Sequence, residues 1–134
     1  MKKYERKKAK VNDLLYVLEE RRIYDLRART FAFAKRILEI AEMLPGTPTC
    51  NAIRIQLIKA GTSVGANIEE ADGSLTRPDF RNRVVIARKE ARETNYWLLL
   101  IAGKYIEEHS LSRDIQEGRE LVKIFSSIIA KAKA

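Results

Sequence analysis

The stretch that decides the fold is RPDFRNRVVIARKEARETNYWLLL, from Arg77 to Leu100. Its apolar and small residues recur at steps of three and four, and the series continues to residue 105. The positions in the series are Phe80, Val84, Ala87, Ala91, Thr94, Leu98, Ile101 and Tyr105. Such steps place side chains on one face of an α-helix, whereas a strand requires alternation. The stretch therefore predicts a helix of about seven turns with one buried face.

The same spacing recurs in three further segments, within residues 23–44, 53–71 and 121–128. Short stretches rich in turn residues separate the four segments: LPGTPT at 44–49, DGSLTRPD at 72–79 and EEHSLSRD at 107–114. Four helices joined by short connections lie antiparallel to their neighbours. We therefore predict an all-α, antiparallel up-and-down four-helix bundle over residues 23–134, with a basic N-terminal extension over residues 1–22.

Capping residues mark two of the helix starts. Thr76, with Pro78 and Asp79 just after it, predicts a capped start for the third helix. Ser110 or Ser112 is the predicted cap of the last helix. Before the first helix, VNDLLYVLEER at 11–21 is weakly amphipathic, so it either extends that helix or forms a separate arm.

Positive charge is concentrated near the N-terminus. Residues 1–36 hold 12 Lys/Arg and 5 Asp/Glu, a net charge of +7, whereas residues 37–134 hold 14 and 13, a net of +1. Such asymmetry favours binding to a polyanion, although a solubilising tail has the same composition. The predicted nucleic-acid-binding residues are Lys2, Lys3, Arg6, Lys7, Lys8, Lys10, Arg21, Arg22, Arg27 and Arg29.

No constellation of catalytic residues stands out. The single histidine, His109, lies beside a predicted turn, and the Glu-x-x-His of di-iron bundles does not occur. The segment GTSVG lacks the Gly-Lys-Ser/Thr ending of a phosphate-binding loop. We therefore expect no enzyme activity, no catalytic residues, no metal and no cofactor. Cys50 is alone, so no internal disulfide is expected.

The longest apolar runs fall well short of the roughly 20 residues that span a bilayer. No apolar segment of a signal peptide follows the basic N-terminus. We expect a cytoplasmic protein without a membrane partner.

The stretch GTSVGANIEEAD at 61–72 combines small and polar residues on a helix, which is typical of a site, a close helix contact or a subunit joint. Gly61 and Gly65 share a face and favour close approach of another helix. Asn67 lies beside the apolar seam and needs a hydrogen-bond partner. The predicted structural polar network consists of Ser63, Asn67, Glu70, Glu90 and Glu93.

The third helix carries a second apolar stripe, made of Val85, Ile86, Trp97 and Leu100, with Tyr96 near the main seam. A helix that is apolar on more than one face is central or is shared with another chain. A broad bundle face gives the same pattern. We predict subunit association through this stripe.

Three segments resemble the four-helix-bundle proteins encoded in intervening sequences of bacterial 23S ribosomal RNA genes. They are FAFAKRILEIAEMLP at 31–45, QLIKAGTSVGANIEEA at 56–71 and RPDFRNRVVIARKEARETNYWLLL at 77–100. The resemblance covers about residues 24–131. Its distinctive pattern is Ser-x-x-x-Asn-Ile-x-Glu, here Ser63, Asn67, Ile68 and Glu70.

The resemblance implies an up-and-down bundle, assembly into a ring-shaped homopentamer and no catalytic activity. It also implies that the stretch at 61–72 is a close-packed structural contact. A more distant resemblance, to the accessory variability determinant of diversity-generating retroelements, implies nucleic acid and a reverse transcriptase as partners.

We therefore expect a non-enzymatic, oligomeric accessory protein that binds RNA or DNA electrostatically, beside a reverse transcriptase or ribosomal RNA. The alternative is a protein-interaction scaffold whose basic arm binds an acidic protein.

Overall fold

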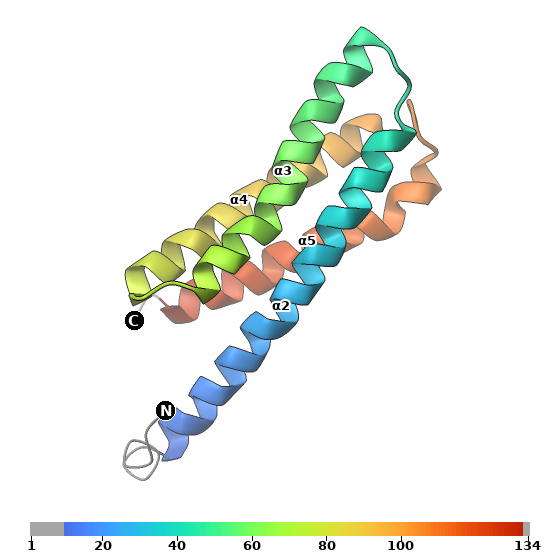
Figure 1. Cartoon of the computed structure of the whole chain (residues 1–134). Coiled ribbons are helices and arrows are strands. Elements are labelled where there is room, and N and C mark those ends of the chain that lie inside the picture. The colour runs from blue at the N-terminus through green and yellow to red at the C-terminus, as the bar shows by residue number, and fades with distance from the viewer. Residues whose placement is uncertain (1–9, 133–134) are drawn as a thin grey trace.

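The protein is a four-helix bundle, as the sequence predicts. A computed structural model describes the backbone of residues 10–132 and the side chains of residues 23 and 25–132. The helices are α2 (Lys10–Met43), α3 (Pro48–Asp72), α4 (Arg77–Ile101) and α5 (Glu108–Ala132). They run up and down around one core, and no strand occurs in the described residues (Figure 1).

The helices are not evenly spaced around the bundle. Each helix packs closely on the next one along the chain, whereas α2 and α5, the first and the last, approach each other less closely. Long side chains are therefore needed to make contact between α2 and α5. No described helix is long and apolar enough to cross a membrane.

Hydroxyl side chains cap two helices. Thr47 accepts a hydrogen bond from the Cys50 amide at 3.2 Å, at the start of α3. Thr76 accepts one from the Asp79 amide at 3.2 Å, which confirms the predicted cap of α4. The prediction for the last helix was wrong, because α5 begins at Glu108 and both candidate serines lie inside it. Ser112 instead donates to the His109 carbonyl at 2.9 Å, within the helix.

The end of α2 is held by an arginine from the next helix. The Arg54 guanidinium donates to the carbonyl oxygens of Ala41 at 2.9 Å, Leu44 at 2.6 Å and Pro45 at 3.0 Å. The last carbonyls of a helix have no partner within the helix, and positive charge there also complements the helix dipole. Arg54 therefore both caps α2 and fixes the turn into α3.

At its other end α2 is longer than predicted. It runs without a break through residues 22 and 23, where the sequence places the start of the bundle. The segment VNDLLYVLEER therefore extends the first helix. Figure 1 shows these N-terminal turns, in blue, continuing past the ends of the other three helices.

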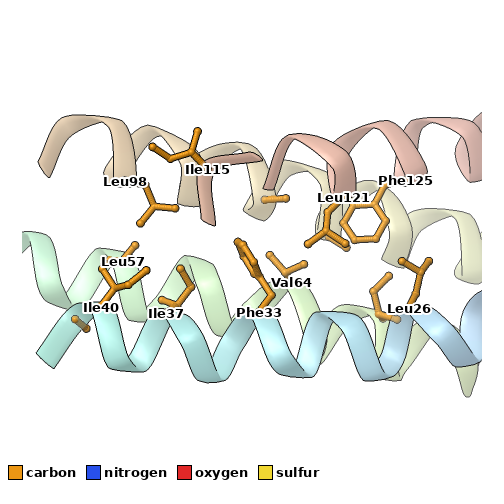
Figure 2. Packing of buried hydrophobic residues seen from close by; sticks show 14 of the residues in the cluster. Leu26, Phe33, Ile37, Ile40, Leu57, Val64, Leu98, Ile115, Leu121 and Phe125 are labelled. Atoms are coloured by element: carbon orange, nitrogen blue, oxygen red, sulfur yellow. The ribbon is translucent and has the colours of Figure 1, made fainter. Parts of the chain in front are cut away.

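The core contains most residues of the predicted apolar series, whereas Phe80 and Tyr105 pack against it partly buried, Tyr105 from beyond the end of α4. Val84, Ala87, Ala91 and Leu98 of α4 are fully buried, and so is Thr94. Figure 2 shows α2 and α5 sending side chains into the same core, Phe33 from α2 and Leu121 and Phe125 from α5. These bulky groups occupy the wider side of the bundle.

On the α2–α3 side, glycines permit close contact. A Cβ atom on Gly61 would lie 2.6 Å from the Ile37 side chain, and one on Gly65 would lie 3.3 Å from the Thr30 carbonyl oxygen. Glycine costs about 1 kcal/mol of helix stability relative to alanine, which is consistent with a need for space. The predicted close approach at these two glycines is confirmed.

Candidate nucleic-acid interface

The predicted basic residues fall into three groups. Five of them, Lys2, Lys3, Arg6, Lys7 and Lys8, lie outside the described residues. Lys10, Arg21 and Arg22 belong to the α2 backbone, but their side chains are outside the described part. Only Arg27 and Arg29 have described side chains.

Arg27 joins α2 to the last turn of α3. It donates two hydrogen bonds of 3.0 Å to the Glu69 carboxylate and one of 3.1 Å to Asp72. Arginine matches the two oxygens of a carboxylate with a planar fork, so this contact fixes geometry as well as charge. The guanidinium of Arg27 is thus engaged within the bundle. Residues 10–22 precede this contact and lie toward the protruding end of α2.

Arg29 makes the corresponding contact to α5. It donates two hydrogen bonds of 2.7 Å to the Glu117 carboxylate and a third of 3.1 Å to Glu120. The hydrogen bonds to Glu117 raise the pKa of Arg29 further above its usual value, although partial burial opposes the shift. The guanidinium therefore stays charged throughout the physiological range.

A further ion pair, which the sequence analysis missed, lies two turns along α2. Arg36 donates to Asp114 at 3.0 Å and 3.3 Å, and the Asp114 side chain is only 12% exposed. The hydrogen bond to Asp114 raises the pKa of Arg36. Spacing could have revealed this row, because Arg29 and Arg36 are seven apart, while Asp114, Glu117 and Glu120 are three apart.

These contacts divide the N-terminal charge into two parts. Arg27, Arg29 and Arg36 pair with carboxylates of other helices and hold the bundle together. Residues 2–22 hold 8 Lys/Arg and 4 Asp/Glu, a net charge of +4. A net charge of +4 therefore lies ahead of the described ion pairs of α2 with the other helices.

The structure does not bring the five predicted polar-network residues together. Ser63 donates to the Lys59 carbonyl at 2.6 Å, and Asn67 donates to the Ser63 carbonyl at 2.8 Å, both within α3. Asn67 accepts a long hydrogen bond of 3.4 Å from Arg83 of α4. Ser63 and Asn67 thus find their hydrogen-bond partners within α3 or, for the Asn67 oxygen, in Arg83 of α4.

The antiparallel packing of α3 and α4 separates the carboxylates of this set. Asn67 of α3 contacts Arg83 of α4, so these two residues mark one level along the bundle. Glu90 lies seven residues beyond Arg83 along α4, and Glu70 lies three residues beyond Asn67 along α3. Because the helices are antiparallel, the two steps run in opposite directions and add to ten residues. Ten residues of helix correspond to about 15 Å along the axis. Glu93 lies one turn beyond Glu90 and accepts a hydrogen bond of 3.3 Å from the Trp97 indole.

A buried polar contact that the sequence did not indicate joins α4 to α5. Asn95 is 9% exposed and donates to the Ile115 carbonyl at 3.2 Å. Its side-chain oxygen has no hydrogen-bond partner among the described residues. A Cβ atom on Gly118 would overlap the Asn95 amide group, so glycine makes room for this contact.

The predicted second stripe of α4 is partly exposed. Ile86 is 37% exposed, Leu100 46% and Tyr96 59%, whereas Val85 and Trp97 pack partly against the core. Leu99, which was not part of the predicted stripe, is 53% exposed. The rings of Tyr96 and Trp97 meet edge to face, with centroids 5.1 Å apart. Apolar side chains thus remain on the outer face of α4.

Together these features define a small antiparallel four-helix-bundle protein, closed by inter-helix ion pairs, with a basic extended first helix. Residues 23–127 match the family model of the 23S rRNA-intervening sequence protein. The chain belongs to this family, so the resemblance noted in the sequence is confirmed. The relation to the retroelement protein stays a prediction.

A solved structure agrees with the family. The chain is similar to a protein with unknown function from the S23 ribosomal protein family of Bacteroides thetaiotaomicron, with 35% sequence identity and a TM-score of 0.74. The similarity covers 81% of this chain and 98% of that chain. No curated protein sequence matches the chain.

Proposed function

We propose that this protein is a non-enzymatic, oligomeric accessory protein that binds nucleic acid through the phosphate backbone. The observation that carries the proposal is the net charge of +4 in residues 2–22, ahead of the bundle contacts of α2. The arginines that follow are paired with carboxylates and stabilise the bundle. The cations of residues 2–22 are therefore the proposed contacts for an anionic partner, distinct from the arginines that pair within the bundle.

Oligomerisation is supported by the outer face of α4. Ile86, Tyr96, Leu99 and Leu100 are all more than a third exposed and lie on one helix. A second copy that covered this face would remove apolar surface from water, which is favourable. A homopentamer is the assembly that the family resemblance implies. Several copies on one particle would engage one strand together and raise the apparent affinity.

Phosphate contacts make a specific experimental prediction. Each cation that neutralises a phosphate releases condensed counterions, so affinity falls steeply with salt. The test is binding of the full chain to labelled RNA and DNA of the same sequence, over a salt series from about 50 to 200 mM. We expect binding at low salt and a linear loss of log affinity with log salt.

A chain that binds neither nucleic acid at about 50 mM salt contradicts the proposal, since electrostatic binding is favoured there. In that case an acidic protein partner becomes the better explanation of the N-terminal charge. The setting beside a ribosomal RNA or a reverse transcriptase belongs to the proposal as well. A gene located in or beside either of these supports it.

A further inference from the structure

Helix α5 has charges of opposite sign on two of its sides. Asp114, Glu117 and Glu120 point to α2, where they bind Arg36 and Arg29. Arg119 and Lys123 are exposed and form no hydrogen bond or ion pair with any described residue. The acidic side is therefore neutralised within the fold, while the basic side is not.

Two contacts between α4 and α5 show which residues face each other. Arg88 donates to the Ser126 hydroxyl at 3.2 Å, and Asn95 donates to the Ile115 carbonyl at 3.2 Å. Since the helices are antiparallel, the part of α4 between Arg88 and Asn95 lies beside residues 115–126 of α5. The level of Arg92 thus corresponds to about residue 119 or 120 of α5.

The same contacts place the side chains on adjoining faces. Arg92 follows Arg88 by four residues and so shares the side of α4 that meets α5. Arg119 precedes Ser126 by seven residues and so shares the side of α5 that meets α4. Lys123 is one turn from Arg119, and Arg92, Arg119 and Lys123 are all exposed.

Carboxylates near this position are directed elsewhere. Glu93 accepts a hydrogen bond from Trp97 on its own helix, and Glu117 and Glu120 bind Arg29 on α2. Glu90 is two residues from both Arg88 and Arg92, and this spacing places it on the opposite side of α4. The cations between α4 and α5 therefore have no carboxylate to neutralise them among the described residues.

We propose that Arg88, Arg92, Arg119 and Lys123 form a second phosphate-binding surface, the α4–α5 basic surface, for the backbone of a nucleic-acid strand. The inference rests on the proposed function and adds a site within the bundle itself. Three of the four cations are arginines, whose planar donors match phosphate oxygens. They occur as pairs spaced four residues apart on two adjoining helices, which places several donors within reach of one strand.

An acidic protein is a weaker candidate for the same surface. Stable protein interfaces have an apolar centre surrounded by a polar rim. The exposed residues that define the α4–α5 basic surface are charged, and their half-buried neighbour Ser126 is polar. The exposed apolar residues Tyr96 and Leu99, one and two turns along α4 from Arg92, border this surface and belong to the outer face of α4. Charge complementarity to a phosphate backbone needs no apolar centre.

The test compares two triple variants of the full chain that lose the same charge. The first carries Arg92→Gln, Arg119→Gln and Lys123→Gln, and it keeps Arg88 because that residue bonds to Ser126. The matched control carries Lys59→Gln, Lys104→Gln and Arg113→Gln, all exposed and located away from this surface. Circular dichroism and thermal unfolding check that both variants fold.

Binding is measured with labelled single strands of RNA and DNA and with poly-glutamate, over the same salt series. Each phosphate contact with a single strand contributes about 0.7 to the salt slope, so losing three cations should reduce the slope by about 2. At about 100 mM salt the first variant should bind at least about 10-fold more weakly than the control. A loss with RNA alone, with DNA alone or with both supports the α4–α5 basic surface and identifies the strand.

Equal weakening of the two variants overturns the inference, because general charge then explains the loss. A loss confined to poly-glutamate also overturns it and favours a protein partner. These outcomes leave the proposed function intact if the unmodified chain binds nucleic acid. If the unmodified chain binds none, the proposed function and this inference both fail.

Discussion

Arg29 of α2 and Glu117 of α5 are joined by two hydrogen bonds of 2.7 Å across the side of the bundle where neighbouring helices approach least closely. Here the guanidinium and carboxylate span a distance that small apolar side chains cannot close. The pair is only partly exposed, with 35% and 29% of the two side chains accessible. Long charged side chains thus join the helices where they lie apart, whereas glycine lets α2 and α3 lie close together.

Replacing Glu117 by glutamine should weaken this side of the bundle. Glu117→Gln keeps the shape but removes the charge that Arg29 faces. Ion pairs near the surface contribute about 1 kcal/mol or less, because solvent screens them. We expect the free energy of unfolding to fall by about that amount in a denaturant titration. Glu42→Gln, an exposed residue on α2, is the control and should change nothing. Equal stability of the two variants would show that the contact is not stabilising.

Because Asn95 and Gly118 are in close contact, substitutions at the two positions should have coupled effects on stability. Gly118→Ala improves helix propensity by about 1 kcal/mol, but its methyl group would overlap the Asn95 side chain. Overpacking of this kind costs about 1–3 kcal/mol, so the melting temperature should fall. Adding Asn95→Ala should restore most of the loss, since the overlapping atoms are gone. If the double variant is no more stable than Gly118→Ala alone, the two residues are not in the contact described.

The α2–α3 contact makes a similar prediction at Gly61. A methyl group there would lie 2.6 Å from the nearest Ile37 atom, and the two helices would have to separate. We expect Gly61→Ala to destabilise the fold by about 1–3 kcal/mol despite its better helix propensity. At Gly46 the added Cβ meets no atom within 4 Å, so Gly46→Ala should be neutral. Thermal unfolding of both variants tests the contrast.

The outer face of α4 predicts self-association that a charge would disrupt. Light scattering of the unmodified chain should give several times the 15.4 kDa monomer mass, with a pentamer expected. Leu100→Glu should shift the mass toward the monomer, because burying an unpaired carboxylate is costly. Leu75→Glu is the control, since Leu75 is 98% exposed in a connecting segment. A monomeric unmodified chain at micromolar concentration would rule out the association.

Deleting residues 1–10 removes six of the Lys/Arg residues together with Glu5. Because the described core residues and inter-helix ion pairs all follow the deleted segment, at residue 23 and beyond, the fold and oligomer should be unchanged. Binding to RNA or DNA should weaken, and the dependence of log affinity on log salt should become shallower. A deletion that leaves binding unchanged would assign it to other cations, such as Arg21 and Arg22 or the α4–α5 basic surface.

The fold could be predicted from sequence because its signals are local. Steps of three and four marked the buried face of α4 from Phe80 onward, and Thr76 marked its start. The glycines of α3 indicated a close neighbour but not that Ile37 would be in contact. Such a partner depends on how two helices meet, which spacing within one helix does not reveal.

The polar contacts were less predictable for the same reason. Asn95 is one position from the expected seam residue Thr94, yet both are buried because α5 covers that edge of α4. Arg54 binds carbonyls 9 to 13 residues earlier, through a turn whose geometry the sequence does not specify. The predicted network around Asn67 failed to assemble because the antiparallel packing separates its carboxylates.

The continuous first helix projects beyond the contacts that hold it to the other helices. From Arg27, where α2 meets the last turn of α3, to Lys10 the helix covers 17 residues, or about 25 Å. Ile23 is the first core residue of α2 among those described, so the 13-residue segment from Lys10 to Ile23, about 20 Å long, extends beyond the core. The carboxylates of Glu69 and Asp72 that hold Arg27 therefore help to fix the direction of the helix segment that precedes it.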